Sequence, residues 1–412
     1  MRAAPECGPF MTQLSFLPTF PFPASPLVLF GLLLLAGVIG GELVKRALNL
    51  PRIVGYVLAG LLLGAGGFNL LHAELVLESW IFVEIALGLV LFELGRRLHF
   101  KWLRNDPWLL ATGLLESALA FGFLYLTLTY FGVQPIYAAV AAAIGVSTSP
   151  AVVLLVAQEL KAEGQVTERA LNLTALNNVV AFVLTTMLLS WIHHEYQAGW
   201  ATVALHPVYL LGGSLALGFA ASVMAIVLSR WLGQRAERQF ALVLALIVLT
   251  IGAARMLELS VLLALLALGV FSRNLDTRHD VMAVDISGIG QIFYVVLFVV
   301  SGAKLQVVEL MMGGGLALAY VAARLAGKMI GVMSLSHLSG VRPGTALMLG
   351  IALTPMSGLA LAMVHGTADF YPEFGARLSA IVLSAVLILE LIGPVAVQFA
   401  LKRAGEARDA AA

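Results

Sequence analysis

Charged residues and cysteine are both scarce in this chain. Only 11% of its 412 residues are charged, against roughly a quarter in soluble domains, while 60% are hydrophobic. This composition indicates an integral membrane protein. The formal net charge of +1 argues against nucleic acid or a strongly acidic partner. The single cysteine, Cys7, excludes an intramolecular disulfide and leaves no cysteine pair for a metal, and nothing indicates a cofactor.

Segments outside the apolar runs are short. Residues 1–25 contain Pro and Phe but neither a basic region nor a small-residue cleavage site, so we expect an N-terminal tail rather than a signal peptide. A transmembrane domain is expected over 26–402 and a cytoplasmic tail over 403–412. Because no loop is long enough for a soluble domain, we expect the protein to act within the lipid bilayer and not as an enzyme.

The apolar runs predict an all-α membrane protein with about thirteen transmembrane helices, at about 20 residues each. Their expected spans are 26–46, 52–70, 77–98, 107–131, 136–159, 167–192, 206–232, 238–257, 259–274, 286–303, 310–337, 344–367 and 376–402. Only Arg255 and Glu258 separate the eighth from the ninth. Most lysines and arginines fall in loops after odd-numbered helices or in the C-terminal tail. The positive-inside rule therefore predicts an external N-terminus and a cytoplasmic C-terminus in a bacterial-type inner membrane.

Two polar stretches interrupt these helices. Residues 145–151, Gly-Val-Ser-Thr-Ser-Pro-Ala, break the fifth helix at Pro150, and residues 353–358, Leu-Thr-Pro-Met-Ser-Gly, break the twelfth at Pro355. Proline frees backbone carbonyls that hydrocarbon cannot satisfy, so each break must face protein or water. Broken helices in corresponding halves of a chain are the best sequence indication of a transporter's binding site. Hydroxyls beside proline also occur where they only satisfy a kink, and this alternative stays open.

Ionisable residues at membrane depth are functional candidates because charge is costly there. Glu116 lies about ten residues into its helix, near mid-membrane, and is the best acidic proton carrier; the alternative is a carboxyl that joins two helices. Arg324 and Lys328 share one helix face and need an acidic partner, an anionic substrate or the carbonyl ends of half-helices. Glu42 and Glu93 are interpreted as partners of nearby lysines and arginines at the membrane interface. Glu84 has a role either in helix packing or in function. Glu390 is interpreted as a structural cap where Gly393-Pro394 ends the last helix.

Several motifs resemble the monovalent cation:proton antiporters, specifically the Kef-type branch of the sodium/proton exchanger superfamily. The matching stretches occur in the family's order over nearly all of 26–402. They are 50–60 (LPRIVGYVLAG), 91–95 (LFELG), 147–153 (STSPAVV), 259–264 (LSVLLA) with Leu268-Gly269, 297–302 (LFVVSG), Arg324 and Gly327-Lys328 with Gly331, and 390–394 (ELIGP).

This resemblance implies two inverted repeats with broken crossing helices, a homodimer, and transport by an elevator-type movement. It also implies that Thr148, Ser149, Thr354 and Ser357 line the crossing and that Arg324 and Lys328 approach it. One position departs from the pattern: the family's titrating aspartate on helix six is Asn178 here, after Asn177. Because an amide does not titrate near neutral pH, the family's exchange step cannot occur at this position.

We therefore predict a secondary transporter that exchanges a monovalent cation, Na⁺ or K⁺, for a proton. The predicted ion and proton ligands are Thr148, Ser149, Asn177, Asn178, Glu116, Thr354 and Ser357, with Arg324 and Lys328 as core charges and no metal beyond the transported alkali cation. Two alternatives remain on the same fold: a carrier of an anionic solute, for which the two cations would supply a positive site, and a transport-inactive membrane sensor.

Overall fold

All regular secondary structure is helical in the residues that the computed structural model describes. These are 26–64, 66–68, 70, 79–100, 106–195, 200–233, 235–276, 290–305, 307–356, 360, 363–364 and 372–408. Within them, eight spans are long and apolar enough to cross a bilayer, and four shorter helices are also apolar. The predictions of an all-helical, multi-pass membrane protein are therefore confirmed.

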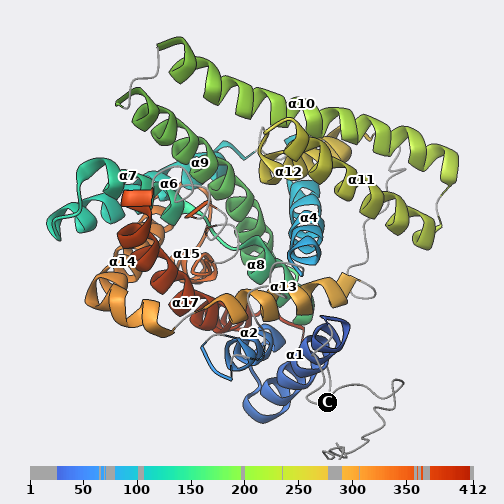
Figure 1. Ribbon diagram of the computed structural model, residues 1–412, viewed down its shortest axis with the longest axis horizontal. Helices are drawn as coiled ribbons and strands as arrows, with labels where there is room; N and C mark the ends of the chain where they lie inside the picture. The colour runs from blue at the N-terminus through green and yellow to red at the C-terminus, as the bar shows by residue number, and fades with distance from the viewer. Residues whose placement is uncertain are drawn as a thin grey trace, which may run out of the picture.

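The helices pack as two bundles, and the first contains both broken helices. We call it the crossing bundle, because its members contact one another more than they contact the rest of the chain. It comprises α6 (Pro107–Tyr130), α7 (Pro135–Val146), α8 (Pro150–Glu159), α9 (Gln165–Glu195), α14 (Val307–Ser334), α15 (Pro343–Ala352) and α17 (Pro372–Arg403). In Figure 1, α6, α7, α14, α15 and α17 gather on the left, with α8 and α9 nearer the centre.

The second bundle, here the frame bundle, lies against α8, α9 and α17. It comprises α1 (Pro26–Leu48), α2 (Arg52–Leu63), α4 (Trp80–Arg97), α10 (Trp200–Leu232), α11 (Ala236–Met256), α12 (Val261–Leu275) and α13 (Gly290–Lys304). Figure 1 shows α4, α10, α11 and α12 at the upper right and α1, α2 and α13 below. The contact surface between the two bundles is called the seam below.

The described helices match the thirteen predicted ones when α7 and α8 are taken as halves of one span. The eighth and ninth helices are separate, since α11 ends at Met256 and α12 begins at Val261. The second helix is shorter than predicted: α2 ends at Leu63, because the glycines that follow, Gly64, Gly66 and Gly67, disfavour helix.

The predicted span of the last helix, 376–402, agrees with its observed end at Arg403, but the interpretation of Gly393-Pro394 as a helix end was wrong. Helix α17 continues through Pro394 to Arg403, so Gly393-Pro394 does not end it and Glu390 does not cap it. Proline is tolerated inside membrane helices where neighbouring helices accommodate the freed carbonyl. In this chain Gly393 lets α17 approach Pro355 closely, since a Cβ on Gly393 would lie 2.9 Å from the Cα of Pro355.

Two glycines bring α14 against α6. A Cβ on Gly327 would collide with the backbone of Ala120, and one on Gly331 would collide with the backbone of Glu116. Small residues four positions apart permit this close approach of membrane helices. Their spacing places Lys328, which lies between them, directly beside the helix that carries Glu116.

Candidate functional site

The site begins with two interrupted helices that are joined through their backbones. Helix α7 ends at Val146 and α8 begins at Pro150, which leaves Ser147–Ser149 extended. Helix α15 ends at Ala352, and Thr354–Met356 lie outside any helix. The N–H of Ser149 donates to the carbonyl of Pro355 at 2.9 Å. The two breaks therefore meet, and each leaves carbonyls that need donors from elsewhere.

Arg324 on α14 supplies most of those donors. Its guanidinium donates to the carbonyls of Gly145 (2.8 Å), Ser147 (2.6 Å), Thr354 (2.6 Å) and Pro355 (3.3 Å). The side chain is fully buried. The planar, forked guanidinium suits this task because its N–H groups point in fixed directions toward several acceptors. Arg324 thus ties both breaks to α14.

One turn along α14, Lys328 makes a different set of contacts. Its ammonium lies 2.5 Å from the Oε1 atom of Glu116 and donates to the carbonyl of Val146 (2.9 Å) and the hydroxyl of Thr148 (3.1 Å). Both charged side chains are 0% exposed. An ion pair in such a place is favourable only when the remaining donors and acceptors are also satisfied, and Val146 and Thr148 do this for the lysine.

Polar groups from α6 and α9 complete the surroundings of the Glu116 carboxylate. The amide of Asn177 donates to Oε1 of Glu116 at 3.4 Å and to the Thr148 hydroxyl at 3.3 Å. Ser117 donates to the carbonyl oxygen of the Asn177 side chain at 3.1 Å and lies 3.4 Å from the other Glu116 oxygen. Glu116, Thr148, Asn177 and Lys328 therefore form one buried network.

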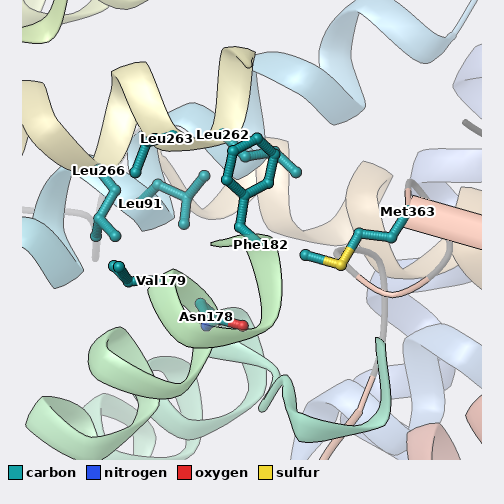
Figure 2. Close-up of a pocket in the computed structure, with 8 residues that line it drawn as sticks. All are labelled: Leu91, Asn178, Val179, Phe182, Leu262, Leu263, Leu266 and Met363. Atoms are coloured by element: carbon teal, nitrogen blue, oxygen red, sulfur yellow. The ribbon is translucent and has the colours of Figure 1, made fainter. Parts of the chain in front are cut away.

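Asn178 faces the seam. Its amide nitrogen donates to the carbonyl of Thr148 at 2.9 Å, but its side-chain oxygen is buried and has no hydrogen-bond partner among the described residues. A cavity of about 10 Å³, roughly room for one water, lies beside it. Figure 2 shows Asn178 below the leucines of α4 and α12, with the Phe182 ring beside these leucines and Met363 to the right. This oxygen is an unused acceptor where the two bundles meet.

The Glu116–Lys328 pair is electrically neutral, Arg324 beside it adds one positive charge, and the site is rich in oxygen. Glu116 offsets Lys328, and the charge of Arg324 is spread over four carbonyls. Carboxylate, hydroxyl, amide and carbonyl oxygens are the ligands that a partly dehydrated alkali cation uses in membrane sites. Among the described residues, no group of three His, Cys, Asp or Glu side chains is arranged to hold a metal ion.

The structure gathers most of the sequence-predicted site residues. Glu116, Thr148, Asn177, Asn178, Arg324 and Lys328 lie together, Pro150 begins α8, and Thr354 and Pro355 contribute backbone carbonyls. Ser149 caps α8 by accepting from the N–H of Val152 at 3.4 Å. Ser357 lies outside the described residues. Sequence reasoning missed Ser117, although its position beside Glu116 could have indicated it.

The other membrane glutamates lie elsewhere. Glu42 pairs with Arg46 (2.7 Å) and Arg52 (3.2 Å), and Glu93 lies 3.7 Å from Arg97. Glu84 pairs with Arg255 of α11, a contact within the frame bundle. Glu390 is fully buried on α17 and accepts a 2.6 Å hydrogen bond from Ser301 of α13. None of these four joins the Glu116 network in the part of the chain that the structure describes.

Solved structures show where this architecture occurs. The chain is similar to the sodium proton antiporter MjNhaP1 from Methanocaldococcus jannaschii at pH 8, with a TM-score of 0.71 and 16% identity over 92% of this chain and 99% of that one. An electron-microscopy map of MjNhaP1 gives a TM-score of 0.67 at 15% identity, covering 91% and 94%. At these identities the similarity shows a shared fold.

Sequence comparison supplies the family. A search of curated proteins finds no match. The family model described as "Sodium/hydrogen exchanger, transmembrane" matches residues 30–403, which is most of the 412 residues. The chain therefore belongs to the sodium/hydrogen exchanger transmembrane family.

Proposed function

We propose that this protein is a monovalent cation:proton antiporter in which Glu116 replaces the aspartate that its relatives carry on the helix of Asn177 and Asn178. The main observation in support is the buried Glu116–Lys328 pair at the crossing of the two breaks, where Lys328 also donates to Val146 and Thr148. The Glu116 carboxylate is surrounded by oxygen ligands and already binds an ammonium group. An alkali cation that enters this site would compete with the Lys328 ammonium for the carboxylate.

The cost of a net charge in a buried site sets the exchange. When a cation binds the Glu116 carboxylate, the fully buried site would hold one positive charge too many unless a proton leaves. The coupled pair releases that proton to water on the open side, and the ammonium contact with Glu116 is lost. On the other side the pair takes up a proton, the contact reforms and the cation leaves. One cation thus exchanges for one proton at this pair.

The ligands follow from the same geometry. Thr148 joins the parts of the site, because its hydroxyl accepts from Lys328 and Asn177 and its carbonyl accepts from Asn178. Asn177 and Asn178 act as neutral ligands, and the unused oxygen of Asn178 is available to the cation. Thr354 contributes oxygens from the second break, Ser357 stays a predicted ligand because it lies outside the described residues, and Arg324 holds the breaks together.

The fold supports an alternating-access movement of elevator type. The crossing bundle carries the whole Glu116 network, so we propose that it slides along the seam against the frame bundle. We further propose a homodimer in an inner membrane with the N-terminus outside and the C-terminus in the cytoplasm, two inverted repeats, and membership of the Kef-type branch, on the motifs described above. The site disfavours the anion-carrier alternative, since Glu116 offsets the charge of Lys328 and the N–H groups of Arg324 already bind four carbonyls.

The direct test is proton flux in proteoliposomes that contain the purified protein and a pH-sensitive dye, challenged in turn with Li⁺, Na⁺ and K⁺. We expect cation-triggered flux in the wild type and a loss of roughly 100-fold or more in Glu116→Gln. Glu163→Gln is the matched control, because Glu163 is an exposed carboxylate that pairs with Arg408, and it should transport normally. Absence of flux with every cation would contradict the antiporter proposal.

Asn178→Asp tests the site from the other direction. It returns an acid to the position where relatives carry one, and we expect stronger cation-dependent flux that no longer depends fully on Glu116. The substitution replaces the amide that donates to the Thr148 carbonyl, so we also expect a stability cost of about 1–3 kcal/mol. Unchanged flux in this variant would indicate that Asn178 does not face the transported cation.

A further inference from the structure

Glu390 is a second carboxyl at membrane depth that the proposed exchange does not use. Its side chain is 0% exposed and sits thirteen residues before the end of α17 at Arg403. One oxygen accepts the 2.6 Å hydrogen bond from Ser301, and the other, Oε2, has no hydrogen-bond partner in the described part of the chain. A carboxylate with so few donors would be costly there, whereas a neutral carboxyl would not.

The described residues around Glu390 offer no compensating charge. Among the side chains that the structure describes, the titratable and charged ones on the helices in contact with α17, and on α13, are Arg52, Tyr56, Tyr137, Glu159, Tyr320, Arg324 and Lys328, with Tyr294 and Lys304 on α13. Each of the cations among them has another partner. Arg52 contacts Glu42 and Glu159, Lys304 lies over the ring of Trp80, and Arg324 and Lys328 are held as described above. No ion pair involving Glu390 forms among the described residues.

The backbone beside this carboxyl is also short of donors. Pro394 has no N–H, and it lies four residues after Glu390 within a continuous helix. The carbonyl of Glu390 therefore lacks its usual helical donor. The position combines a carboxyl oxygen without a partner and a carbonyl without its helical N–H, so it accommodates a proton on the carboxyl more readily than a negative charge.

The Ser301–Glu390 hydrogen bond crosses the seam, because Ser301 belongs to the frame bundle and Glu390 to the crossing bundle. One turn after Glu390 on the same helix, Gly393 packs against Pro355 in the second break. Movement of that break with α17 relative to α13 would separate Glu390 from Ser301. Separation removes the hydrogen bond and exposes the carboxyl to whatever fills the opened seam.

Space for water already exists in the seam. A cavity of about 150 Å³ lies between α2, α8 and α13, with Tyr294 in its lining. Tyr294 and Ser301 are seven residues apart and therefore lie on one face of α13, about 10 Å along its axis. The cavity and the Ser301–Glu390 contact thus lie on the same face of α13. A proton released from Glu390 could leave along this face toward the cavity.

We propose that Glu390 is a second proton-binding site, protonated while it contacts Ser301 and deprotonated to water when the seam opens. The proposal rests on the antiport proposed above and adds one proton to each cycle. In the contact state the carboxyl is neutral. On opening toward one side of the membrane, its O–H bond breaks, the proton passes to water on that side and the carboxylate is hydrated; a proton from water on the opposite side binds the carboxylate before the contact with Ser301 reforms. Two protons per cation make transport electrogenic.

Infrared spectroscopy of the reconstituted protein tests the protonation directly. We expect the C=O stretch of a neutral carboxyl in the wild type and its loss in Glu390→Gln, which keeps nearly the same shape. Glu116→Gln should leave this band in place, because Glu116 is paired with Lys328. Ser301→Ala should keep the band but shift it, since the hydrogen bond is lost. A wild-type minus Glu390→Gln difference without the band would overturn the proposal.

The reversal potential of cation-driven proton flux tests the coupling. We expect electrogenic exchange in the wild type and, in Glu390→Gln, one proton fewer per cation and therefore electroneutral exchange that still requires Glu116. A band that disappears with an unchanged ratio would also overturn the proposal, because the proton would then be structural. If the wild type shows no cation-triggered flux, the antiport proposal fails by itself, and the infrared band alone decides the state of Glu390.

Discussion

Arg324 and Lys328 are two cations on one helix face, both fully buried, yet their partners differ in kind. Arg324 donates to four backbone carbonyls of the two breaks. Lys328 contacts a carboxylate, a carbonyl and a hydroxyl. Backbone carbonyls do not titrate, so a change of protonation does not open the Arg324 contacts. Glu116 and Lys328 can both change protonation, so their contact is one that a proton or a competing cation can open.

The comparison indicates how one helix serves two purposes. A guanidinium stays charged and binds in fixed directions, which suits the carbonyls that the interrupted helices leave free. An ammonium is compact and more readily exchanged. Tyr320, one turn before Arg324, extends the series, because its hydroxyl donates to the carbonyl of Ala141 at 2.8 Å. Three residues at four-residue spacing thus contact residues 141–148, the end of α7 and the break that follows it.

The largest effect is expected from Arg324→Gln, which removes the guanidinium that binds the carbonyls of both breaks. Up to four carbonyls at the crossing would lose their donor, at about 1–3 kcal/mol for each one left unpaired. We expect loss of folded protein or a large fall in the thermal unfolding temperature in detergent. Arg342→Gln is the control, because Arg342 is exposed and its loss should change stability by less than about 0.5 kcal/mol. Equal unfolding temperatures would contradict this role of Arg324.

A smaller effect on stability is expected when Glu116 and Lys328 are replaced, singly or together. Lys328→Met or Glu116→Gln alone leaves a buried charge without its partner, at about 3–5 kcal/mol. The double variant removes both charges, so it should be clearly more stable than the sum of the single effects predicts, while transport stays absent. The exposed pair Arg408 and Glu163 gives the control cycle, with a coupling of about 1 kcal/mol or less. Additive losses at Lys328 and Glu116 would mean that the two are not coupled.

The smallest effect is expected from Tyr320→Phe, which removes one neutral hydrogen bond and keeps the ring. The unfolding free energy should fall by about 1 kcal/mol, and cation-triggered flux should persist. Chemical denaturation in detergent and the proteoliposome assay measure the two quantities. Loss of flux without loss of stability would show that the hydroxyl takes part in transport and that the series on α14 is not divided as described.

The outline of this molecule could be predicted from the sequence because it depends on local properties. Hydropathy over about 20 residues predicted the membrane spans, and proline beside hydroxyls at Pro150 and Pro355 predicted the breaks. The motifs predicted the sodium/hydrogen exchanger family, which the family model confirmed. Local reasoning was wrong at Pro394, where proline usually ends a helix. There α17 continues, because packing against its neighbours outweighs the local preference.

Only the tertiary structure decided which buried charges meet. Glu116 and Lys328 are 212 residues apart, and the sequence left the partner of each open. Their contact depends on how α6 and α14 are rotated and how closely Gly327 and Gly331 let them approach. The pairing of Glu390 with Ser301 likewise depends on where two separate bundles touch. Composition and periodicity determine which segments enter the membrane, whereas the packing of one helix face on another determines which polar groups find partners there.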